Sequence, residues 1–253
     1  MSPSSRPVLS VRGLSKNFGA LAVAQAVDID LSKGARVGLI GPNGAGKTTL
    51  VNLLTGMIRP DAGSILLEGT EIRHMRPELR VRRGLARTHQ INNLLVDNTA
   101  RENVAIAIAE RKGIAWRILR FGVRWRECLE EADARLSEMG ISRAADRRVS
   151  ELAYGQQRLL EIAIALSLKP RVLMLDEPAA GVPSTEAHVI HDVLDHLPPD
   201  IAILIIEHDM DVIFRFAREI VVLVQGKVLT RGKPEDISVD ERVRAVYLGH
   251  TKV

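Results

Sequence analysis

The stretch of sequence that decides the fold is Gly41-Pro42-Asn43-Gly44-Ala45-Gly46-Lys47-Thr48. A short apolar run, Arg36 to Ile40, precedes it and predicts a buried strand, whereas the residues from Lys47 to about Met57 predict a helix. Glycines allow successive backbone N–H groups to point inward at a phosphate, and the positive N-terminal end of the helix adds to that attraction. This order of strand, turn and helix predicts a cradle for the phosphates of a nucleotide.

The charged end of this cradle has two expected roles. Lys47 neutralises oxygens of the β- and γ-phosphates, and the Thr48 hydroxyl is a ligand for Mg²⁺. An ordinary glycine-rich turn before Lys-Thr is the alternative, and the strand before the turn and the helix after it argue against that alternative. We therefore expect ATP and Mg²⁺ as cofactors. The residues expected to bind ATP here are Gly41, Pro42, Asn43, Gly44, Ala45, Gly46, Lys47, Thr48 and Thr49.

Two adjacent carboxylates, Asp176 and Glu177, close the apolar run Val172 to Leu175. Because side chains alternate along a strand, these two carboxylates point in different directions. Asp176 is expected to hold the water shell of the metal, and Glu177 to orient or deprotonate the water that attacks the γ-phosphate. A charged turn that closes a buried strand is the alternative. The phosphate cradle earlier in the chain favours the catalytic interpretation.

The rest of the chain alternates predicted strands with predicted helices, which indicates a mostly parallel sheet covered on both faces. Further strands are expected near residues 8–11, 27–31, 64–67, 172–175, 201–206 and 220–224, and further helices near 159–168, 185–197 and 210–217. A charged, helical pattern from 91 to 149 predicts an inserted helical subdomain. The α/β core then comprises 8–90 and 150–249, and residues 1–7 and 250–253 are tails.

Composition places the protein among folded cytosolic proteins. Of its 253 residues, 46% are hydrophobic and 26% are charged, which is ordinary for such a chain. The longest aliphatic run, Ile201 to Ile206, is too short to cross a bilayer, and Met1 to Pro7 does not look like a signal peptide. The one cysteine, Cys128, excludes an internal disulfide. The net charge of +4 says little about partners.

A later motif, Leu152-Ala153-Tyr154-Gly155-Gln156-Gln157-Arg158, resembles the signature of ABC ATPases. This variant of the signature is similar to that of the ATPases of branched-chain amino-acid importers, and the resemblance runs from about Val8 to Gly249. Three further segments share it, namely 178–181, 206–210 and 247–249. The resemblance implies an α/β fold of the P-loop NTPase type, with a mostly parallel core, an antiparallel β portion and an inserted α-helical subdomain.

The resemblance also implies roles for single residues. Phe18 stands where the family stacks an aromatic ring on adenine, although a core phenylalanine is the alternative. Gln90 matches the glutamine that ligates the metal and links it to the membrane subunit, and His208 matches the histidine that contacts the γ-phosphate. Without the family, His208 would be read as a structural histidine. The residues that the signature brings to a nucleotide are Ala153, Tyr154, Gly155 and Gln156.

In this family the signature of one subunit faces the phosphate cradle of another, so two ATP molecules lie between two chains. Ala153 departs from the usual serine and cannot donate a hydroxyl hydrogen bond, and Tyr154 departs from the usual glycine. Pro183 replaces the Asp or Asn of many relatives and offers neither a polar side chain nor an N–H. Communication between the two sites is therefore expected to differ from the family pattern.

The expected function is that of the ATP-hydrolysing subunit of an importer for branched-chain or related amino acids. The alternatives are the same motor for urea, amides or aromatic acids, and a soluble ABC ATPase that acts on DNA or ribosomes. Expected partners are a second ATPase subunit, identical or related, the transmembrane permease subunits and, indirectly, a substrate-binding protein, with no nucleic acid. The expected location is the cytoplasmic face of the cell membrane, as a peripheral subunit.

One basic segment, Arg111 to Arg126, holds six basic residues, no acidic residue and both tryptophans of the chain. If it were helical, Ile114, Ile118, Phe121 and Trp125 would share one face, and Arg117, Arg120 and Arg124 another. Two interpretations stay open. The segment is either a solvated basic face of the helical subdomain or a surface turned toward an anionic membrane, where each basic residue contributes about 1 kcal/mol.

Overall fold

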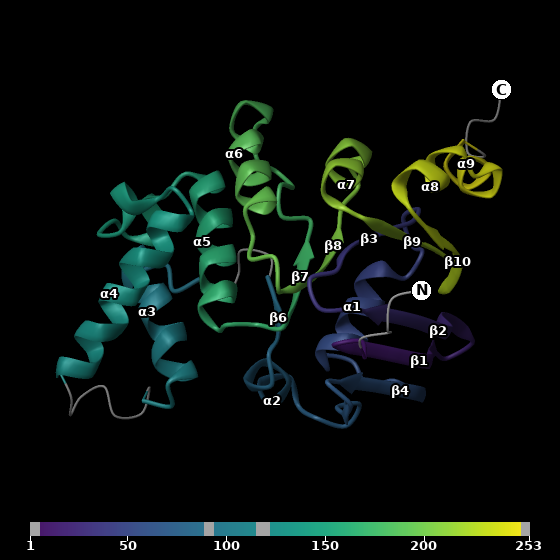
Figure 1. The fold of residues 1–253 in the computed structure, drawn as a ribbon, viewed down its shortest axis with the longest axis horizontal. Helices are drawn as coiled ribbons and strands as arrows, with labels where there is room; N and C mark the ends of the chain where they lie inside the picture. Colours follow the sequence, from purple (N-terminus) through teal and green to yellow (C-terminus); the bar gives the residue numbers. More distant parts are fainter. Residues whose placement is uncertain (1–5, 89–93, 115–121, 249–253) are drawn as a thin grey trace. The chain divides into compact units, whose positions relative to one another are not determined.

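The computed structural model describes residues 6–88, 94–114 and 122–248. The chain divides into two compact units (Figure 1). The first unit consists of Met1–Leu85, Arg171–Glu177 and Pro198–Val253, and the second consists of Ala86–Pro170 and Pro178–Leu197. The chain therefore leaves the first unit twice and returns to it twice. No helix within the described ranges is long and apolar enough to cross a membrane.

The larger sheet has six strands in the order β10-β9-β3-β8-β7-β6. Their bounds are β3 (Arg36–Ile40), β6 (Leu85–Arg87), β7 (Val172–Asp176), β8 (Ala202–Ile206), β9 (Glu219–Val224) and β10 (Lys227–Gly232). Strand β3 runs parallel to β8 and β9, β7 runs parallel to β8, and only the β9–β10 pair is antiparallel among the pairs described. Every residue of β7 and β8 is buried. The sequence prediction of a mostly parallel, doubly covered sheet is therefore confirmed.

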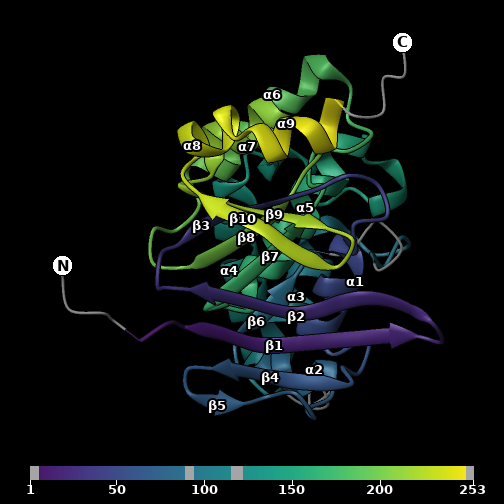
Figure 2. The same cartoon turned by 90° about the vertical axis from the view of Figure 1, so that its right-hand side faces the viewer.

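A second, antiparallel sheet has the strand order β2-β1-β4-β5 (Figure 2). Its strands are β1 (Leu9–Phe18), β2 (Leu21–Leu31), β4 (Ala62–Leu67) and β5 (Thr70–Glu71). One face of this sheet joins the core of the first unit, which continues through α1 and the large sheet. This is the antiparallel portion that the family resemblance implied.

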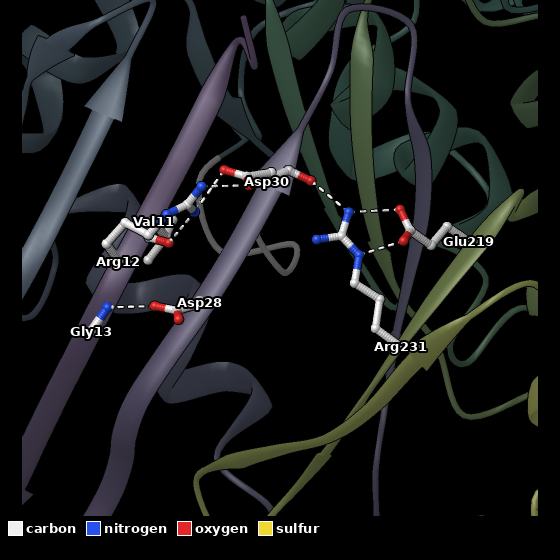
Figure 3. Close-up of polar contacts among 7 residues, drawn as sticks. All are labelled: Val11, Arg12, Gly13, Asp28, Asp30, Glu219 and Arg231. Carbon is white, nitrogen blue, oxygen red and sulfur yellow. Dashed lines mark hydrogen bonds and ion pairs between the residues drawn. The ribbon is translucent and has the colours of Figure 1, made fainter. Parts of the chain in front are cut away.

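Strands β1 and β2 extend well beyond the predicted 8–11 and 27–31, and polar side chains pair across their exposed face. Arg12 makes a bidentate ion pair with Asp30, with N–O distances of 2.7 and 2.6 Å (Figure 3). This pairing lowers the pKa of Asp30, against the opposing effect of burial. Arg231 of β10 donates to the Asp30 backbone oxygen at 3.0 Å and pairs with Glu219 of β9. Polar partners thus connect the two sheets of the first unit.

The helices of the first unit are α1 (Lys47–Thr55), α2 (Pro77–Arg82), α7 (Met210–Phe216), α8 (Pro234–Val239) and α9 (Glu241–Leu248). The first of them, α1, ends two residues before the predicted Met57. Gly56 ends the helix with φ 85°, and its N–H donates to the Leu53 oxygen at 3.3 Å. Left-handed backbone of this kind favours glycine, so Gly56 acts as the stop signal.

The second unit contains the helices α3 (Ala100–Arg111), α4 (Gly122–Glu138), α5 (Tyr154–Ser167) and α6 (Ser184–Asp195), with short 3₁₀ turns at Ser142–Ala144 and Val149–Glu151. Thr99 and Glu102 form a reciprocal capping box that starts α3. Arg111 at the end of α3 pairs with Glu131 of α4 and donates to the Ser167 oxygen of α5. The second unit is helical, and it takes in α5 and α6, which lie outside the helical subdomain predicted at 91–149.

Candidate active site

The candidate active site lies in the first unit, where three neighbouring parallel strands end. Strand β8 lies between β3 and β7, and Ile206 pairs with both Leu39 and Asp176. Since the strands are parallel, the residues that follow them meet at one edge of the sheet. Gly41 follows β3, Glu177 follows β7, and His208 comes shortly after β8. Open α/β sheets bind their ligands at this carboxyl edge.

The turn after β3 is closely packed against other backbone. A Cβ atom on Gly41 would lie 2.1 Å from the Leu223 oxygen, and one on Gly46 would lie 2.5 Å from the Val23 oxygen. Gly46 has φ 100° and precedes the first turn of α1. These two positions therefore require glycine for steric reasons, and the cradle is held in shape by strands β2 and β9.

Lys47 is buried at the start of α1. Its Nζ atom donates to the Gly41 oxygen at 2.7 Å and to the Pro42 oxygen at 3.1 Å. Burial lowers the pKa of Lys47, and the charges of Glu177 and Asp176 oppose that shift. Backbone oxygens thus hold the ammonium group beside the loop. A bound anion would stabilise its charge, because burial disfavours the charged form.

The two predicted carboxylates occupy the end of β7. Asp176 is only 9% exposed, whereas the Glu177 side chain is 27% exposed. Glu177 has φ 48°, and its backbone N–H donates to the Ile206 oxygen at 2.9 Å. A non-glycine residue with a positive φ is uncommon and indicates that tertiary contacts hold Glu177 in place. The predicted divergence of the two side chains stays a prediction.

His208 meets Glu177 directly, which the sequence did not predict. Its Nε2 atom lies 2.6 Å from Glu177 Oε1. The neighbouring Glu207 is 7% exposed, and its side chain accepts the His208 backbone N–H at 3.2 Å. The loop after β8 therefore fixes a histidine against the carboxylate at the end of β7. This arrangement can orient the Glu177 carboxylate and stabilise its charge.

Two aromatic residues, Phe18 and Tyr247, are relevant to the phosphate cradle. Phe18 is 49% exposed at the β1–β2 hairpin, with Lys16 Nζ 5.6 Å from its ring centre, so it is not a core residue. An exposed ring beside the strand that contacts Gly46 is suited to stack on a base. Tyr247 of α9 belongs to the segment 247–249 that shares the family resemblance, but no role at the site was predicted for it. Burial raises the pKa of Tyr247, against the effect of a hydrogen bond with the Gly41 backbone.

The oxygen atoms at the site fit Mg²⁺ that arrives with a nucleotide. Thr48 is exposed at the start of α1, and Asp176 ends β7. The described part of the chain has no group of three or more His, Cys, Asp or Glu residues that would hold a metal by itself. Mg²⁺ typically takes one or two carboxylates together with substrate phosphates and water, so the sparse protein ligand set suits it. Gln90, the third predicted ligand, lies outside the described residues.

The signature residues lie at the start of α5 in the second unit. Ala153 is the N-cap, and its backbone N–H donates to Gln156 Oε1 at 3.2 Å. The Ala153 methyl group cannot return the bond that a Ser hydroxyl would make to the helix backbone, so only half of a capping box is present. The missing hydroxyl therefore deprives α5 of one N-cap hydrogen bond.

Tyr154 is the centre of a side-chain network in the second unit. Its hydroxyl oxygen accepts from Arg158 Nη2 at 2.9 Å, and the Arg158 guanidinium lies 5.1 Å from its ring centre. Arg158 also pairs with Glu161 Oε2 at 3.0 Å, and both of these side chains are buried. A Cβ atom on Gly181 would lie 3.1 Å from Tyr154 Oη. The tyrosine thus packs against the loop that follows Asp176 and Glu177.

That loop leads into α6 through Pro183. The Pro183 oxygen accepts from the backbone N–H groups of Glu186 and Ala187, at 2.8 and 3.0 Å. Proline has the backbone angle that a helix N-terminus requires, with φ −54° here. A role for Pro183 in coupling between sites stays a prediction.

The basic segment is described only at its ends. Arg111 and Lys112 both pair with Glu131, and Ile114 is 9% exposed. Arg117 and Arg120, on which the membrane interpretation depends, lie outside the described residues, so that interpretation stays a prediction.

Comparison with known proteins places these features in a family. Residues 24–180 match the family model described as ABC transporter. The chain is 39% identical to the high-affinity branched-chain amino acid transport ATP-binding protein BraF of Pseudomonas aeruginosa, covering 97% of this chain and 99% of that protein. It is 38% identical to the corresponding protein LivG of Escherichia coli, with the same coverage. Among solved structures, the ADP conformation of an ATP-binding cassette of an ABC transporter matches with a TM-score of 0.84 and 30% identity, over 97% of this chain and 100% of that chain.

Proposed function

This chain belongs to the ABC transporter family, and on that premise we propose that it is the ATP-hydrolysing subunit of an importer for branched-chain or closely related amino acids. The observation that carries the enzymatic part is the contact of Glu177 with His208 beside the Lys47 cradle. The observation that supports the cargo is the match over nearly the whole chain to two transport ATPases for branched-chain amino acids.

In this proposal the chain's own residues divide the work of hydrolysis. Lys47 and the backbone N–H groups of the cradle bind the β- and γ-phosphates of ATP. Glu177 accepts a proton from the attacking water, and His208 fixes the orientation of the Glu177 carboxylate. Phe18 stacks on adenine. Thr48, Asp176 and Gln90 hold Mg²⁺, which neutralises charge on the phosphates when it is bound with ATP.

The complete site is proposed to need a second subunit. One chain carries one cradle and one signature, and the signature consists of a glycine at the start of a helix, which is an anion-binding arrangement. Gly155 and its neighbours Ala153, Tyr154 and Gln156 would therefore complete the site of a partner ATPase, identical or related. The dimer would attach to separate permease subunits at the cytoplasmic face of the membrane, with a substrate-binding protein as the indirect partner.

The cargo itself is the part of the proposal with an open alternative. The ribose import ATP-binding protein RbsA 1 of Rhizobium meliloti is 34% identical over 94% of this chain, although the matched part is 46% of that protein. Motors for different cargoes are thus similar, because the motor does not contact the cargo. Urea, amides and aromatic acids therefore remain the alternative cargoes.

Reconstitution tests the proposal. The chain, its partner ATPase, the permeases and the binding protein encoded beside them would be assembled in vesicles, and uptake of labelled leucine, urea and phenylalanine would be compared. We expect ATP-dependent leucine uptake that is lost with Glu177→Gln. Uptake of urea without leucine would replace the cargo assignment, and ATP-independent uptake would contradict the proposed function.

A further inference from the structure

A small basic cavity lies in the first unit, away from the active-site edge, beside the C-terminal end of α1 and the start of α2. It has a volume of about 220 Å³. Five of its lining residues are basic and none of those described is acidic. The basic ones are Arg59, Arg73, His74, Arg76 and Arg80.

Arg80 forms the fixed wall of this cavity and is only 1% exposed. Its Nη1 atom donates to the Leu53 and Leu54 oxygens at 2.8 and 2.6 Å, so it caps the C-terminal end of α1. Its Nε and Nη2 atoms donate to the Met75 and Arg73 oxygens, at 3.1 and 2.8 Å. A guanidinium has five N–H groups, and these four bonds leave one Nη2 hydrogen without a partner among the described residues.

The charge of Arg80 has no carboxylate partner within ion-pair distance in residues 6–88, 94–114 and 122–248. Burial lowers the pKa of Arg80, and the more distant charge of Glu71 opposes that shift. The partial negative charge at the end of α1 offsets part of the cost of burying a cation. A bound anion would reduce the remaining free-energy cost of burying the Arg80 cation, because buried charges are stable chiefly when they are paired.

Arg73 is the second fixed residue of the cavity. Its Nη1 and Nη2 atoms donate to the Gly63 and Asp61 oxygens at 2.7 and 3.2 Å. Its Nε atom is buried and has no hydrogen-bond partner. Buried N–H groups are nearly always bonded, so this unpaired donor is a second sign that a ligand is missing from the protein's own atoms.

Exposed basic side chains stand at the mouth of the cavity. Arg59 Nη2 lies 3.1 Å from His74 Nδ1, and Arg76 makes no ion pair within the described part of the chain. Guanidinium groups favour phosphate because they can bind two of its oxygens at once. The volume is below that of cavities that bind drug-sized ligands, so it suits a single phosphate group better than a whole nucleotide.

We propose that this cavity is a second anion site, which binds one phosphate group, either as free phosphate or as the headgroup phosphate of a membrane lipid. Arg80 and Arg73 form its preorganised wall, and Arg59 and Arg76 close over the anion from the mouth. No step of ATP hydrolysis needs this site.

Calorimetry tests the shared chemistry. Inorganic phosphate would be titrated into the Lys47→Ala chain, in which the nucleotide cradle is disabled, with sodium chloride keeping the ionic strength constant. Arg59→Gln with Arg76→Gln, added to that background, should weaken phosphate binding at least tenfold. Arg83→Gln with Arg218→Gln is the matched control, since it removes two exposed arginines of the same unit that do not line the cavity. Equal affinity in the two double variants, or no binding of phosphate, would overturn the proposal.

Vesicle flotation distinguishes the two sources of phosphate. Phosphatidylcholine vesicles with 20% phosphatidic acid, a composition chosen on the order of natural anionic content, would be mixed with each double variant, with Lys47 intact. Selective loss of flotation in the Arg59/Arg76 variant identifies a lipid headgroup. Equal flotation, together with the calorimetric difference, identifies free phosphate. Both outcomes support the cavity as an anion site.

ATPase activity keeps this proposal separate from the proposed function. The Arg59/Arg76 variant should hydrolyse ATP within about twofold of the wild-type rate, since both side chains are exposed and lie outside the active site. A chain that hydrolyses ATP but shows no phosphate binding at the cavity contradicts only the anion site. A wild-type chain without ATPase activity contradicts the proposed function, whatever the cavity binds.

Discussion

The phosphate cradle and the signature are both expected to hold the same nucleotide phosphates, yet they are built in different ways. The cradle depends on backbone: Gly41 and Gly46 lie so close to neighbouring carbonyl oxygens that a single methyl group would clash. The signature depends on side chains: Tyr154 is held by Arg158, and Arg158 by Glu161. Backbone packing tolerates almost no change of residue type, whereas a side-chain network can be exchanged for another. The difference explains why the cradle matches its sequence pattern and the signature departs from its own.

The largest predicted effect is on the cradle, from Gly41→Ala. The new Cβ would lie 2.1 Å from the Leu223 oxygen, so the backbone must move, and we expect ATP affinity to fall at least 100-fold. Gly44→Ala is the matched control, because open space surrounds a Cβ at Gly44 and only its φ of 78° is strained. That strain costs about 1–2 kcal/mol. Binding of a fluorescent ATP analogue measures the affinity of both variants. Similar losses of affinity in the two would show that packing against Leu223 does not define the cradle.

The next effect concerns the contact between His208 and Glu177, which the proposed function places at the attacking water. His208→Ala removes the partner of Glu177 Oε1. A hydrogen bond to a charged group is worth about 1.5–3 kcal/mol, so we expect kcat to fall roughly 10- to 100-fold while the KM for ATP stays nearly constant. Steady-state kinetics measure the two constants separately. A rise in KM at unchanged kcat would instead make His208 a binding residue.

A smaller effect is expected at the signature, where side chains are exchangeable. Ala153→Ser restores the N-cap acceptor that α5 lacks, and such caps stabilise by about 0.5–2 kcal/mol. Chemical denaturation should therefore show a more stable chain, and ATPase activity should be retained or modestly raised. Ala144→Ser is the control, since Ala144 is buried and lies in a short 3₁₀ turn rather than at an N-cap. A tenfold loss of activity in Ala153→Ser would show that the pocket is packed around the alanine.

The smallest effect is a pH dependence in the network of Tyr154. Burial raises the pKa of Glu161, against the opposing effect of Arg158. The folded chain therefore holds this proton more tightly than the unfolded chain, and its stability falls as the pH rises from the ordinary Glu value through the raised pKa. Glu161→Gln should remove that part of the slope. Denaturation midpoints from pH 4 to pH 7, values on the order of carboxylate titration, would be compared with those of the exposed Glu151→Gln. Identical pH dependence of stability in the Glu161→Gln and Glu151→Gln variants would contradict the assignment of this effect to Glu161.

Sequence predicted the parts of the molecule that local pattern determines. Strand β3 has the predicted bounds, and the cradle, Asp176 and Glu177 lie where the pattern placed them. Contacts between distant segments were not predictable. The contact of Glu177 with His208 joins the ends of two strands, and the hydrogen bond of Tyr247 with the Gly41 backbone joins α9 to the turn after β3. Neither contact has a local signal, because each joins segments that are far apart in the sequence.

Arg80 is a further example of a contact between distant segments that the local sequence pattern does not predict. No helix was predicted at α2 and no role was predicted for Arg80, yet its side chain is buried and caps α1. A long side chain can reach carbonyl groups that a helix in another part of the chain leaves unbonded. Sequence periodicity describes the direction of a side chain from its own helix and contains no information about such distant partners.

The measurement that tests the central assignment most directly is the turnover and ATP binding of Glu177→Gln. Lys47, Thr48 and Asp176 remain in place, so we expect ATP affinity close to that of the wild type and a rate lower by about 10²–10⁴-fold. The trapped ATP should also stabilise a dimer that elutes earlier on size exclusion. Glu235→Gln on the exposed start of α8 is the control and should behave like the wild type. Hydrolysis by Glu177→Gln at a rate near that of the wild type would contradict the assignment of Glu177 as the catalytic base.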